Sequence, residues 1–357
     1  MPSPETTEPA WTHANLLANG QRFHVVHQGE GPLVLLVHGF PEFWYMWRHQ
    51  LPVLAAAGYH VVAADMRGCG RSSKPLRISD YRITEMVADC VGIVEALGHK
   101  QAVIVGHDRG ATVAWTAAWT RPDVFRAVAG LTLPFAGRAL SPVAGVSSLG
   151  EVKPSELYRI VAGSPDRLWY IEYMSMIGAV EAEFDADPRG FLSDMMYTYS
   201  ADSRPADYQL PDVGSLDRDG VLEYLRSTAN CLKTGGRWRD RFLPAPDPLP
   251  DWLAAEIDSY VEEFERTGLR TAPNWYRCTD LNWELLAPYQ GRPVQVPALH
   301  VGMDDLTSVF GHEAIANMAT TVPLLTESVI LTGCGHWIQE KPTEVNEILL
   351  RFLRRIS

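Results

Sequence analysis

Features typical of membrane-bound or disulfide-bonded proteins are missing from this sequence. It contains no apolar run of about 18 residues, and its opening stretch MPSPETTEPAWTHANL lacks a basic start followed by an apolar segment. We therefore expect neither a membrane span nor a signal peptide. The five cysteines are scattered and form no C-x-x-C pair, which disfavours a disulfide framework and a structural zinc site. These absences predict a cytoplasmic protein with free thiols and no bound metal.

Positive charge is also scarce. The 31 Lys and Arg residues are outnumbered by 43 Asp and Glu residues, which gives a formal net charge of −12. Nucleic acid and anionic membranes would repel such a chain, so we expect neither as a partner. The 357 residues, 46% of them hydrophobic, are sufficient for one large domain with an insertion or for two domains.

The hydrophobic pattern indicates an α/β core that is interrupted by a helical insertion. Short apolar runs such as PLVLLVHGF and QAVIVGHD alternate with helix-length amphipathic segments such as ITEMVADCVGIVEALG. This alternation predicts a mostly parallel sheet with helices on both faces. Residues 137–288 show no clear strand and contain helical segments joined by loops rich in Pro, Asp and Gly. We expect a core formed by residues 1–136 and 289–357, with residues 137–288 as a cap.

The segment GHDRG places Asp108 at a sharp turn. Gly106 and Gly110 flank it at two positions on either side, between an apolar strand and the helical segment ATVAWTAAW. This context predicts a nucleophile elbow, in which small neighbours allow the backbone to bend and expose the central side chain. A carboxylate that attacked a carbonyl would form an anhydride, whereas attack on a saturated carbon forms an ordinary ester. The aspartate therefore predicts a substrate with an alkylating carbon.

Two later loops supply the remaining members of a catalytic triad. The segment GCGHW places His336 after a strand, and the segment VGMDD places Asp304 and Asp305 after the preceding one. Nucleophile, acid and histidine then follow the order found in α/β hydrolases. Asp305 fits the G-x-x-D pattern of that loop, and Asp304 is the alternative. Because Asp108 is ionised at neutral pH, His336 is free to activate the water that hydrolyses the ester.

An oxyanion hole is predicted from the loop HGFP, which follows a strand and precedes a helical segment. In this arrangement the loop provides one backbone N–H, and the residue after the nucleophile provides the other. We assign these two donors to Phe40 and Arg109.

The sequence resembles the soluble epoxide hydrolases of the α/β-hydrolase superfamily from about Arg22 onward. The resemblance rests on HGFPEFWYMWRHQ, GHDRGA, GCGHW with KPTEVN after it, and two segments of the cap, DRLWYIEYMSMIG and NWYR. It implies that Tyr170 and Tyr276 hold the epoxide oxygen, with Tyr173, one turn away, as an alternative to Tyr170. It also implies conversion of a small-molecule epoxide and water to a vicinal diol through an ester on Asp108, without a cofactor.

One position departs from the family pattern. Epoxide hydrolases of this type usually have Trp after the nucleophile, where this chain has Arg109. Haloalkane dehalogenases also use a Trp there, whereas fluoroacetate dehalogenases have H-D-R-G and a second Arg at the position of Thr112. Arg109 either contacts a polar group of the substrate or points away and pairs with an acid. A dehalogenase with the same nucleophile and a non-enzymatic small-molecule receptor are the alternative functions.

The cap is rich in aromatic residues and methionine, which predicts an apolar pocket. We expect the substrate to contact Trp44 in the core and Trp169, Tyr173 and Met174 in the cap. The natural substrate, the regioselectivity and the stereoselectivity do not follow from the sequence. A homo-oligomer is compatible with it.

Overall fold

An eight-stranded sheet forms the centre of the computed structural model, which describes residues 11–205, 207–208 and 216–357. Its strand order is β1-β2-β4-β3-β5-β6-β9-β10, and all neighbours are parallel except β1 with β2 and β2 with β4. The strands are β1 (Thr12–Ala18), β2 (Gln21–Gln28), β3 (Leu33–Val37), β4 (His60–Ala64), β5 (Ala102–His107), β6 (Phe125–Leu131), β9 (Ala298–Met303) and β10 (Leu325–Leu331). The mostly parallel sheet predicted from the sequence is confirmed.

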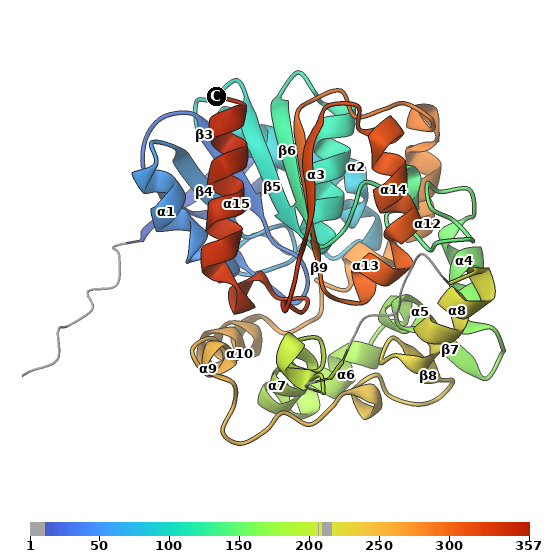
Figure 1. The fold of residues 1–357 in the computed structure, drawn as a ribbon. Helices are drawn as coiled ribbons and strands as arrows, with labels where there is room; N and C mark the ends of the chain where they lie inside the picture. Colours follow the sequence, from blue (N-terminus) through green and yellow to red (C-terminus); the bar gives the residue numbers. More distant parts are fainter. Residues whose placement is uncertain (1–10, 206, 209–215) are drawn as a thin grey trace, which may run out of the picture.

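Helices cover both faces of this sheet (Figure 1). The core helices are α1 (Gln50–Ala56), α2 (Ile83–Ala96), α3 (Arg109–Thr120), α13 (Leu306–Phe310), α14 (His312–Thr321) and α15 (Pro342–Arg355). Helix α1 packs against α15, and α2 packs against α3. Strands β3 and β5 are buried along their whole length, as expected for strands covered on both faces.

The chain leaves the sheet after β6 and returns to it at β9. The helices between these strands are α4 (Pro154–Ala162), α5 (Tyr170–Ser175), α6 (Ala179–Ala186), α7 (Pro188–Thr198), α8 (Arg218–Ser227), α9 (Asp251–Ala254), α10 (Ile257–Thr267), α11 (Asn274–Arg277) and α12 (Thr279–Leu285). Two short strands, β7 (Arg167–Trp169) and β8 (Cys231–Lys233), pair in antiparallel fashion among them. The sequence analysis expected no strand here, because three residues are too few to show an alternating pattern.

Short 3-10 helices occupy several of the connections. They are η1 (Trp44–Trp47), η2 (Ile78–Tyr81), η3 (Gly137–Ala139), η4 (Ala201–Ser203), η5 (Arg239–Arg241), η6 (Ala287–Tyr289) and η7 (Ile338–Glu340). Two of them, η1 and η7, lie in the segments that the sequence analysis linked to catalysis.

The inserted helices α5 to α10 lie below the core in the view of Figure 1. Direct contacts join the two parts. The indole of Trp337, in the core, donates a hydrogen bond to the backbone oxygen of Met196 at 2.7 Å. The guanidinium of Arg48 forms an ion pair with the wholly buried Glu256 of the insertion at 2.7 Å. The core and the insertion therefore share an interior, and the residues at their boundary can form one cavity.

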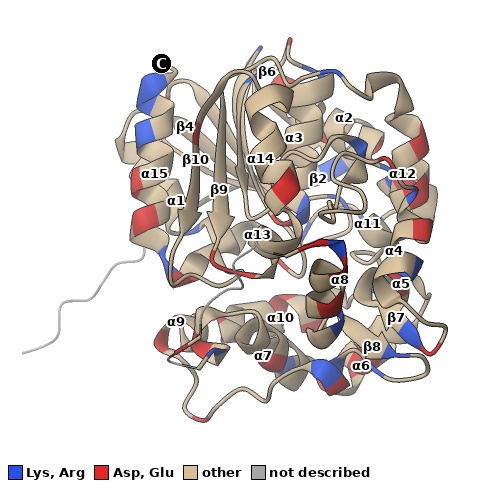
Figure 2. Cartoon of the chain, turned by 45° about the vertical axis from the view of Figure 1, so that its right-hand side comes forward, with Lys and Arg blue, Asp and Glu red and all other residues tan. Residues whose placement is uncertain are grey.

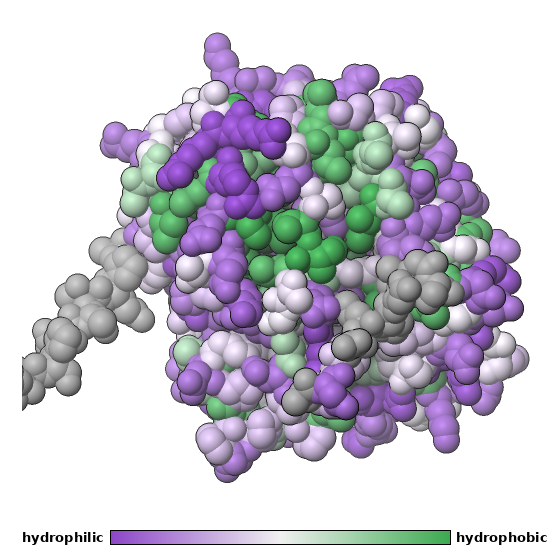
Figure 3. Space-filling view, in the orientation of Figure 1, coloured by the Kyte–Doolittle hydropathy of each residue, from purple (hydrophilic) through white to green (hydrophobic). Residues whose placement is uncertain are grey.

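The surface is predominantly polar, with both signs of charge interspersed. Helices α8 and α15 each carry acidic and basic residues (Figure 2). Apolar side chains also reach the face shown in Figure 3. In the edge strand β10, Ile330 is 42% exposed, and Leu324, directly before the strand, is 49% exposed. Within the described residues, none of the helices combines the length and apolar character needed to cross a bilayer.

Candidate active site

The turn between β5 and α3 has the geometry of a nucleophile elbow. Asp108 occupies it with a positive φ of 50° and a ψ of −122°. A Cβ on Gly106 would lie 2.1 Å from the backbone oxygen of Gly110, and a Cβ on Gly110 would lie 2.2 Å from that of Val37. Larger residues cannot fit at these two positions. The backbone at Asp108 is strained by about 1–3 kcal/mol, which is typical of positions where structure holds a functional side chain in place.

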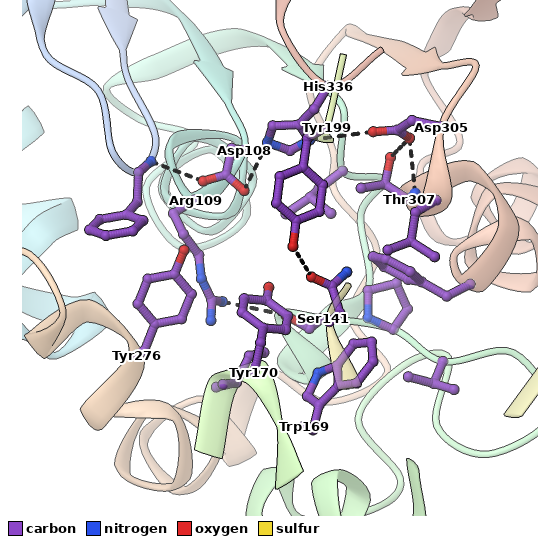
Figure 4. A pocket seen from close by; sticks show the side chains of 18 of the residues that line it. Asp108, Arg109, Ser141, Trp169, Tyr170, Tyr199, Tyr276, Asp305, Thr307 and His336 are labelled. Carbon is purple, nitrogen blue, oxygen red and sulfur yellow. Dashed lines mark hydrogen bonds and ion pairs between the residues drawn. The ribbon is translucent and has the colours of Figure 1, made fainter. Parts of the chain in front are cut away.

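The two carboxylate oxygens of Asp108 have different surroundings. Oδ1 accepts a hydrogen bond from the backbone N–H of Phe40 at 3.0 Å, whereas Oδ2 lies 3.6 Å from Nε2 of His336 (Figure 4). Phe40 thus lies where the predicted oxyanion hole requires it, and the Arg109 backbone begins α3 directly after Asp108. In this arrangement Oδ2 is available to attack a substrate carbon, and Oδ1 becomes the carbonyl oxygen of the resulting ester.

Asp305, rather than Asp304, lies beside the histidine. Nδ1 of His336 lies 3.3 Å from Oδ2 of Asp305, and the Asp305 carboxylate also accepts hydrogen bonds from the Thr307 backbone N–H at 2.9 Å and from the Thr307 hydroxyl. Asp304 instead accepts from the backbone of Gly333 at 3.3 Å. Of the two aspartates left open by the sequence, the structure brings Asp305 into a triad with Asp108 and His336.

Charge around His336 changes its proton affinity. Burial alone would lower its pKa, but the hydrogen bond to Asp305 and the charges of Asp108 and Asp305 together raise the pKa of His336 to about 9. The imidazole therefore holds a proton at neutral pH. Loss of the Asp108 charge would remove one of the causes that raise this pKa.

A second histidine supports the main chain of the first. Nε2 of His107 lies 2.8 Å from the backbone oxygen of His336, and its Nδ1 lies 2.9 Å from Oε2 of Glu42. Glu42 also accepts from the backbone N–H of Gly39 at 2.9 Å, so this buried pair connects the HGFP loop to the histidine loop. The sequence analysis missed both residues, although both belong to quoted motifs. The contact between His107 and His336 spans 229 positions and has no local signal.

Two tyrosines of the helical insertion line the same cavity as Asp108. Tyr170 begins α5 and Tyr276 lies in α11, and their ring centroids are 6.1 Å apart (Figure 4). Burial is the first cause that raises the pKa of both phenols, and the nearby Asp108 charge raises each further. Both hydroxyls therefore carry protons at neutral pH. The hydroxyl of Tyr173 instead donates to Glu183, so the structure places Tyr170 at the site and not its alternative.

A largely apolar cavity connects these groups and contains about 870 Å³ of empty space, counting its opening. It is lined by Phe40, Asp108, Arg109, Leu133, Ser141, Pro142, Val143, Leu157, Tyr158, Trp169, Tyr170, Ile171, Met195, Tyr199, Asn230, Trp238, Tyr276, Asp305, Leu306, Thr307, Phe310, His336 and Trp337. Trp169 lies in this lining as expected. The sequence analysis missed Tyr199 and Trp238, since no pattern along a short helix or loop indicates which aromatic residue faces a cavity.

Three expected substrate contacts lie outside this lining. The ring of Trp44 packs edge-on against Trp11 at 5.6 Å and His13 at 5.4 Å, on the outer side of the HGFP loop. Met174 is wholly buried in the hydrophobic interior, and Tyr173 is held by Glu183. Composition placed these residues at the cavity, but aromatic composition indicates burial without indicating which surface a side chain is buried against.

The side chain of Arg109 lies in the cavity wall. Its guanidinium carbon lies 4.3 Å from the centroid of the Tyr276 ring, and Nη1 donates to the Ser141 hydroxyl at 3.4 Å. Among the described residues, no carboxylate forms an ion pair with it. The sequence left two alternatives for Arg109. The structure does not show the one in which its side chain points away from the site and pairs with an acid.

The described residues contain no cluster of three or more His, Cys, Asp or Glu side chains suited to a metal ion. All five cysteines are unpaired and buried.

Comparisons with known proteins agree with this geometry. Residues 32–149 match the α/β-hydrolase fold family. Epoxide hydrolase B of Mycobacterium tuberculosis is 40% identical over 350 residues, covering 96% of this chain and 98% of that protein, and epoxide hydrolase A of the same organism is 38% identical over 342 residues, covering 94% and 95%. The structure of an epoxide hydrolase from an endophytic Streptomyces superposes with a TM-score of 0.84 at 40% identity, covering 97% of this chain and 96% of that one. This chain therefore belongs to the epoxide hydrolases of the α/β-hydrolase superfamily.

Proposed function

We propose that this protein converts an epoxide and water to a vicinal diol through an ester on Asp108. The observation that carries this proposal is the placement of Asp108 in one cavity with two protonated cap phenols on one side and His336 on the other. A carboxylate nucleophile, two acids and a base are the groups that epoxide opening followed by ester hydrolysis requires.

In the first step, Oδ2 of Asp108 attacks one epoxide carbon and the bond between that carbon and the epoxide oxygen breaks. The oxygen remains on the substrate as it becomes an alkoxide, and it takes a proton from Tyr170 or Tyr276. The ring centroids of Tyr170 and Tyr276 are 6.1 Å apart. The two phenols are therefore close enough to hydrogen-bond to the same oxygen. The product of this step is a hydroxyalkyl ester of Asp108.

In the second step, His336 first transfers its proton to the phenolate left by the first step, and the neutral imidazole then removes a proton from water, so that the resulting hydroxide attacks Cγ of the ester. The backbone N–H groups of Phe40 and Arg109 stabilise the negative charge on Oδ1 of Asp108. Ester formation has removed the charge of Asp108, which lowers the pKa of His336 from about 9 when a base is needed. The intermediate collapses and releases the diol as the new carboxylic acid of Asp108 gives its proton to the departing alkoxide, and the proton taken from water stays on His336, which restores the starting state.

The same nucleophile would serve a dehalogenase, but a departing halide is stabilised by N–H donors and does not need a proton. The two phenols favour epoxide opening over halide displacement, and the complete triad argues against a receptor without catalysis. We further propose that residues 137–288 act as the cap, that the reactants are a small epoxide and water, and that the protein acts in the cytoplasm. Its five free, buried cysteines are consistent with a reducing compartment.

The test is a substrate panel. Purified protein is incubated with aryl, terminal and fatty epoxides, with a bromoalkane and with fluoroacetate, and the release of diol and halide is measured. We expect diol from at least one epoxide class and no halide. Halide release without diol would support the dehalogenase instead, and ligand-induced stabilisation without turnover would support a receptor.

A further inference from the structure

Arg109 is a buried cation without a buried anion beside it. Only 5% of its surface is exposed, although it lines the cavity that contains the nucleophile. The carboxylates of that cavity, Asp108 and Asp305, are both placed for catalysis, and neither is within ion-pair distance of the guanidinium. A charge removed from water without a partner is unfavourable, so such a group usually has a ligand for its partner.

The guanidinium is held with one buried terminal nitrogen unpartnered. One face lies over the ring of Tyr276, and Nη1 donates to the neutral hydroxyl of Ser141 at the long distance of 3.4 Å. Nη2 has no hydrogen-bond partner within the part of the chain that the structure describes. The aromatic ring and the hydroxyl therefore fix the orientation of Arg109 without neutralising it.

The surrounding lining limits the kind of anion that fits. Besides Arg109, the lining contains no other Arg or Lys, and Leu133, Val143 and Leu157 are among its apolar members. One fixed positive charge matches a monoanion, and the planar pair of terminal nitrogens matches the two oxygens of a carboxylate. A doubly charged phosphate would bring an unmatched negative charge into an apolar environment.

We propose that Arg109 determines substrate specificity by binding a carboxylate on the substrate, so that the preferred substrates are epoxides of carboxylic acids. This assignment rests on the proposed epoxide hydrolysis and specifies its substrate class. Asp108 attacks an epoxide carbon while the carboxylate, farther along the same molecule, accepts hydrogen bonds from Nη1 and Nη2. The apolar lining contacts the carbon chain between these two groups.

The experiment compares acids with neutral analogues of the same length. Terminal epoxyalkanoates of increasing chain length, their methyl esters and the matching 1,2-epoxyalkanes are used as substrates for the wild-type protein. We expect kcat/KM to be at least tenfold higher for one or two acid lengths than for their esters, mainly through a lower KM. Raising the salt concentration should affect this ratio little, because the cation is buried.

Variants then assign the preference to one side chain. Arg109→Met removes the charge and should abolish the acid-to-ester preference, whereas Arg109→Lys should retain part of it. The matched control is Arg138→Met, because Arg138 also stacks on an aromatic ring, that of Trp283 at 3.7 Å, but lies outside the cavity lining. That variant should keep the wild-type ratio. The ratio is informative because it cancels any general effect on catalysis.

Two results would overturn the proposal, and each differs from failure of the proposed function. The first is equal use of acids and esters by the wild type. The second is an unchanged acid-to-ester ratio in Arg109→Met; equal losses for acids, esters and epoxyalkanes would give that ratio and would show that Arg109 only positions Tyr276. If the variant does not fold, inhibition of the wild type by hexanoate but not hexanamide supports the proposal, and equal inhibition contradicts it. If no epoxide of any kind is hydrolysed, the proposed function itself is wrong.

Discussion

The core and the cap provide catalytic groups in different ways. In the core, each site residue follows a different strand: Phe40 follows β3, Asp108 follows β5, Asp305 follows β9 and His336 follows β10. Because these strands are parallel, the loops after them lie at one edge of the sheet. In the cap, Tyr170 and Tyr276 lie on two short helices from distant parts of the sequence. The comparison shows that topology alone assembles the nucleophile and base, whereas the acids depend on how the cap packs onto the core.

This difference divides the reaction between the two parts. In the proposed mechanism, the core forms and hydrolyses the ester, and the cap protonates the leaving oxygen and surrounds the substrate. Changes in the core should therefore stop the second step, and changes in the cap should slow the first or alter substrate binding.

The largest effect is expected for the acid of the triad. In Asp305→Asn, His336 loses the charge that orients it and stabilises its protonated form, so ester hydrolysis should slow by roughly 10⁴-fold. Rapid-quench measurement of ester formation and decay checks this. Asp304→Asn is the control, since Asp304 contacts the backbone of Gly333 instead. If the ester accumulates in Asp304→Asn and is hydrolysed at the normal rate in Asp305→Asn, the triad acid is Asp304 and the assignment to Asp305 is wrong.

Removing the cap acids should affect the other step. Tyr170→Phe and Tyr276→Phe should each slow ester formation by roughly 10²-fold, and the double variant more, because the epoxide oxygen loses its hydrogen-bond donors. Single-turnover kinetics separates this step from hydrolysis. The matched control is Tyr173→Phe, whose hydroxyl donates to Glu183 and not to the cavity. If the double variant forms the ester at the wild-type rate, the two cap tyrosines do not protonate the epoxide oxygen.

A third prediction concerns the proton on His336. Asp108→Asn, which mimics the uncharged ester, should lower the pKa of His336 from about 9, whereas Asp304→Asn should leave it unchanged. Because the raised pKa keeps the proton on His336 at neutral pH, a lower value frees the base there. Ester hydrolysis should therefore rise with pH to a plateau whose midpoint lies below 9. NMR titration of the imidazole measures the shift, and equal pKa values in both variants would refute the coupling.

The smallest effect is expected for two tryptophans that the sequence placed at the substrate, of which only Trp169 lines the cavity. Trp169→Phe should change KM several-fold because Trp169 lines the cavity, whereas Trp44→Phe should change kcat/KM little because its ring packs against Trp11 and His13. Steady-state kinetics on one epoxide is sufficient. A larger change in Trp44→Phe would place the substrate-binding surface on the other side of the HGFP loop.

The contrast between core and cap also explains what the sequence could predict. The glycines around Asp108 and the order of the triad are local features of strand ends, so the core site follows from the sequence. The choice between Asp304 and Asp305 does not, because it depends on which carboxylate caps α13 through the Thr307 backbone.

In the cap, the six residues of α5 are too few for periodicity to distinguish its faces. Trp169 and Tyr170 were therefore predicted at the cavity together with Tyr173 and Met174, which lie elsewhere. Pairing between β7 and β8, and the Glu42–His107 support of His336, depend on contacts between distant segments. Such contacts leave no pattern in a single sequence.

The central claim is that Asp108 becomes covalently attached to the substrate and that His336 acts only afterwards. The most direct measurement is mass spectrometry of His336→Gln after incubation with a reactive epoxide. We expect the protein mass to increase by the mass of the whole epoxide, with the addition on the peptide that contains Asp108, because the ester forms but is not hydrolysed. Continued diol production by this variant without any adduct on Asp108 would mean that water attacks the epoxide directly, and would contradict the account.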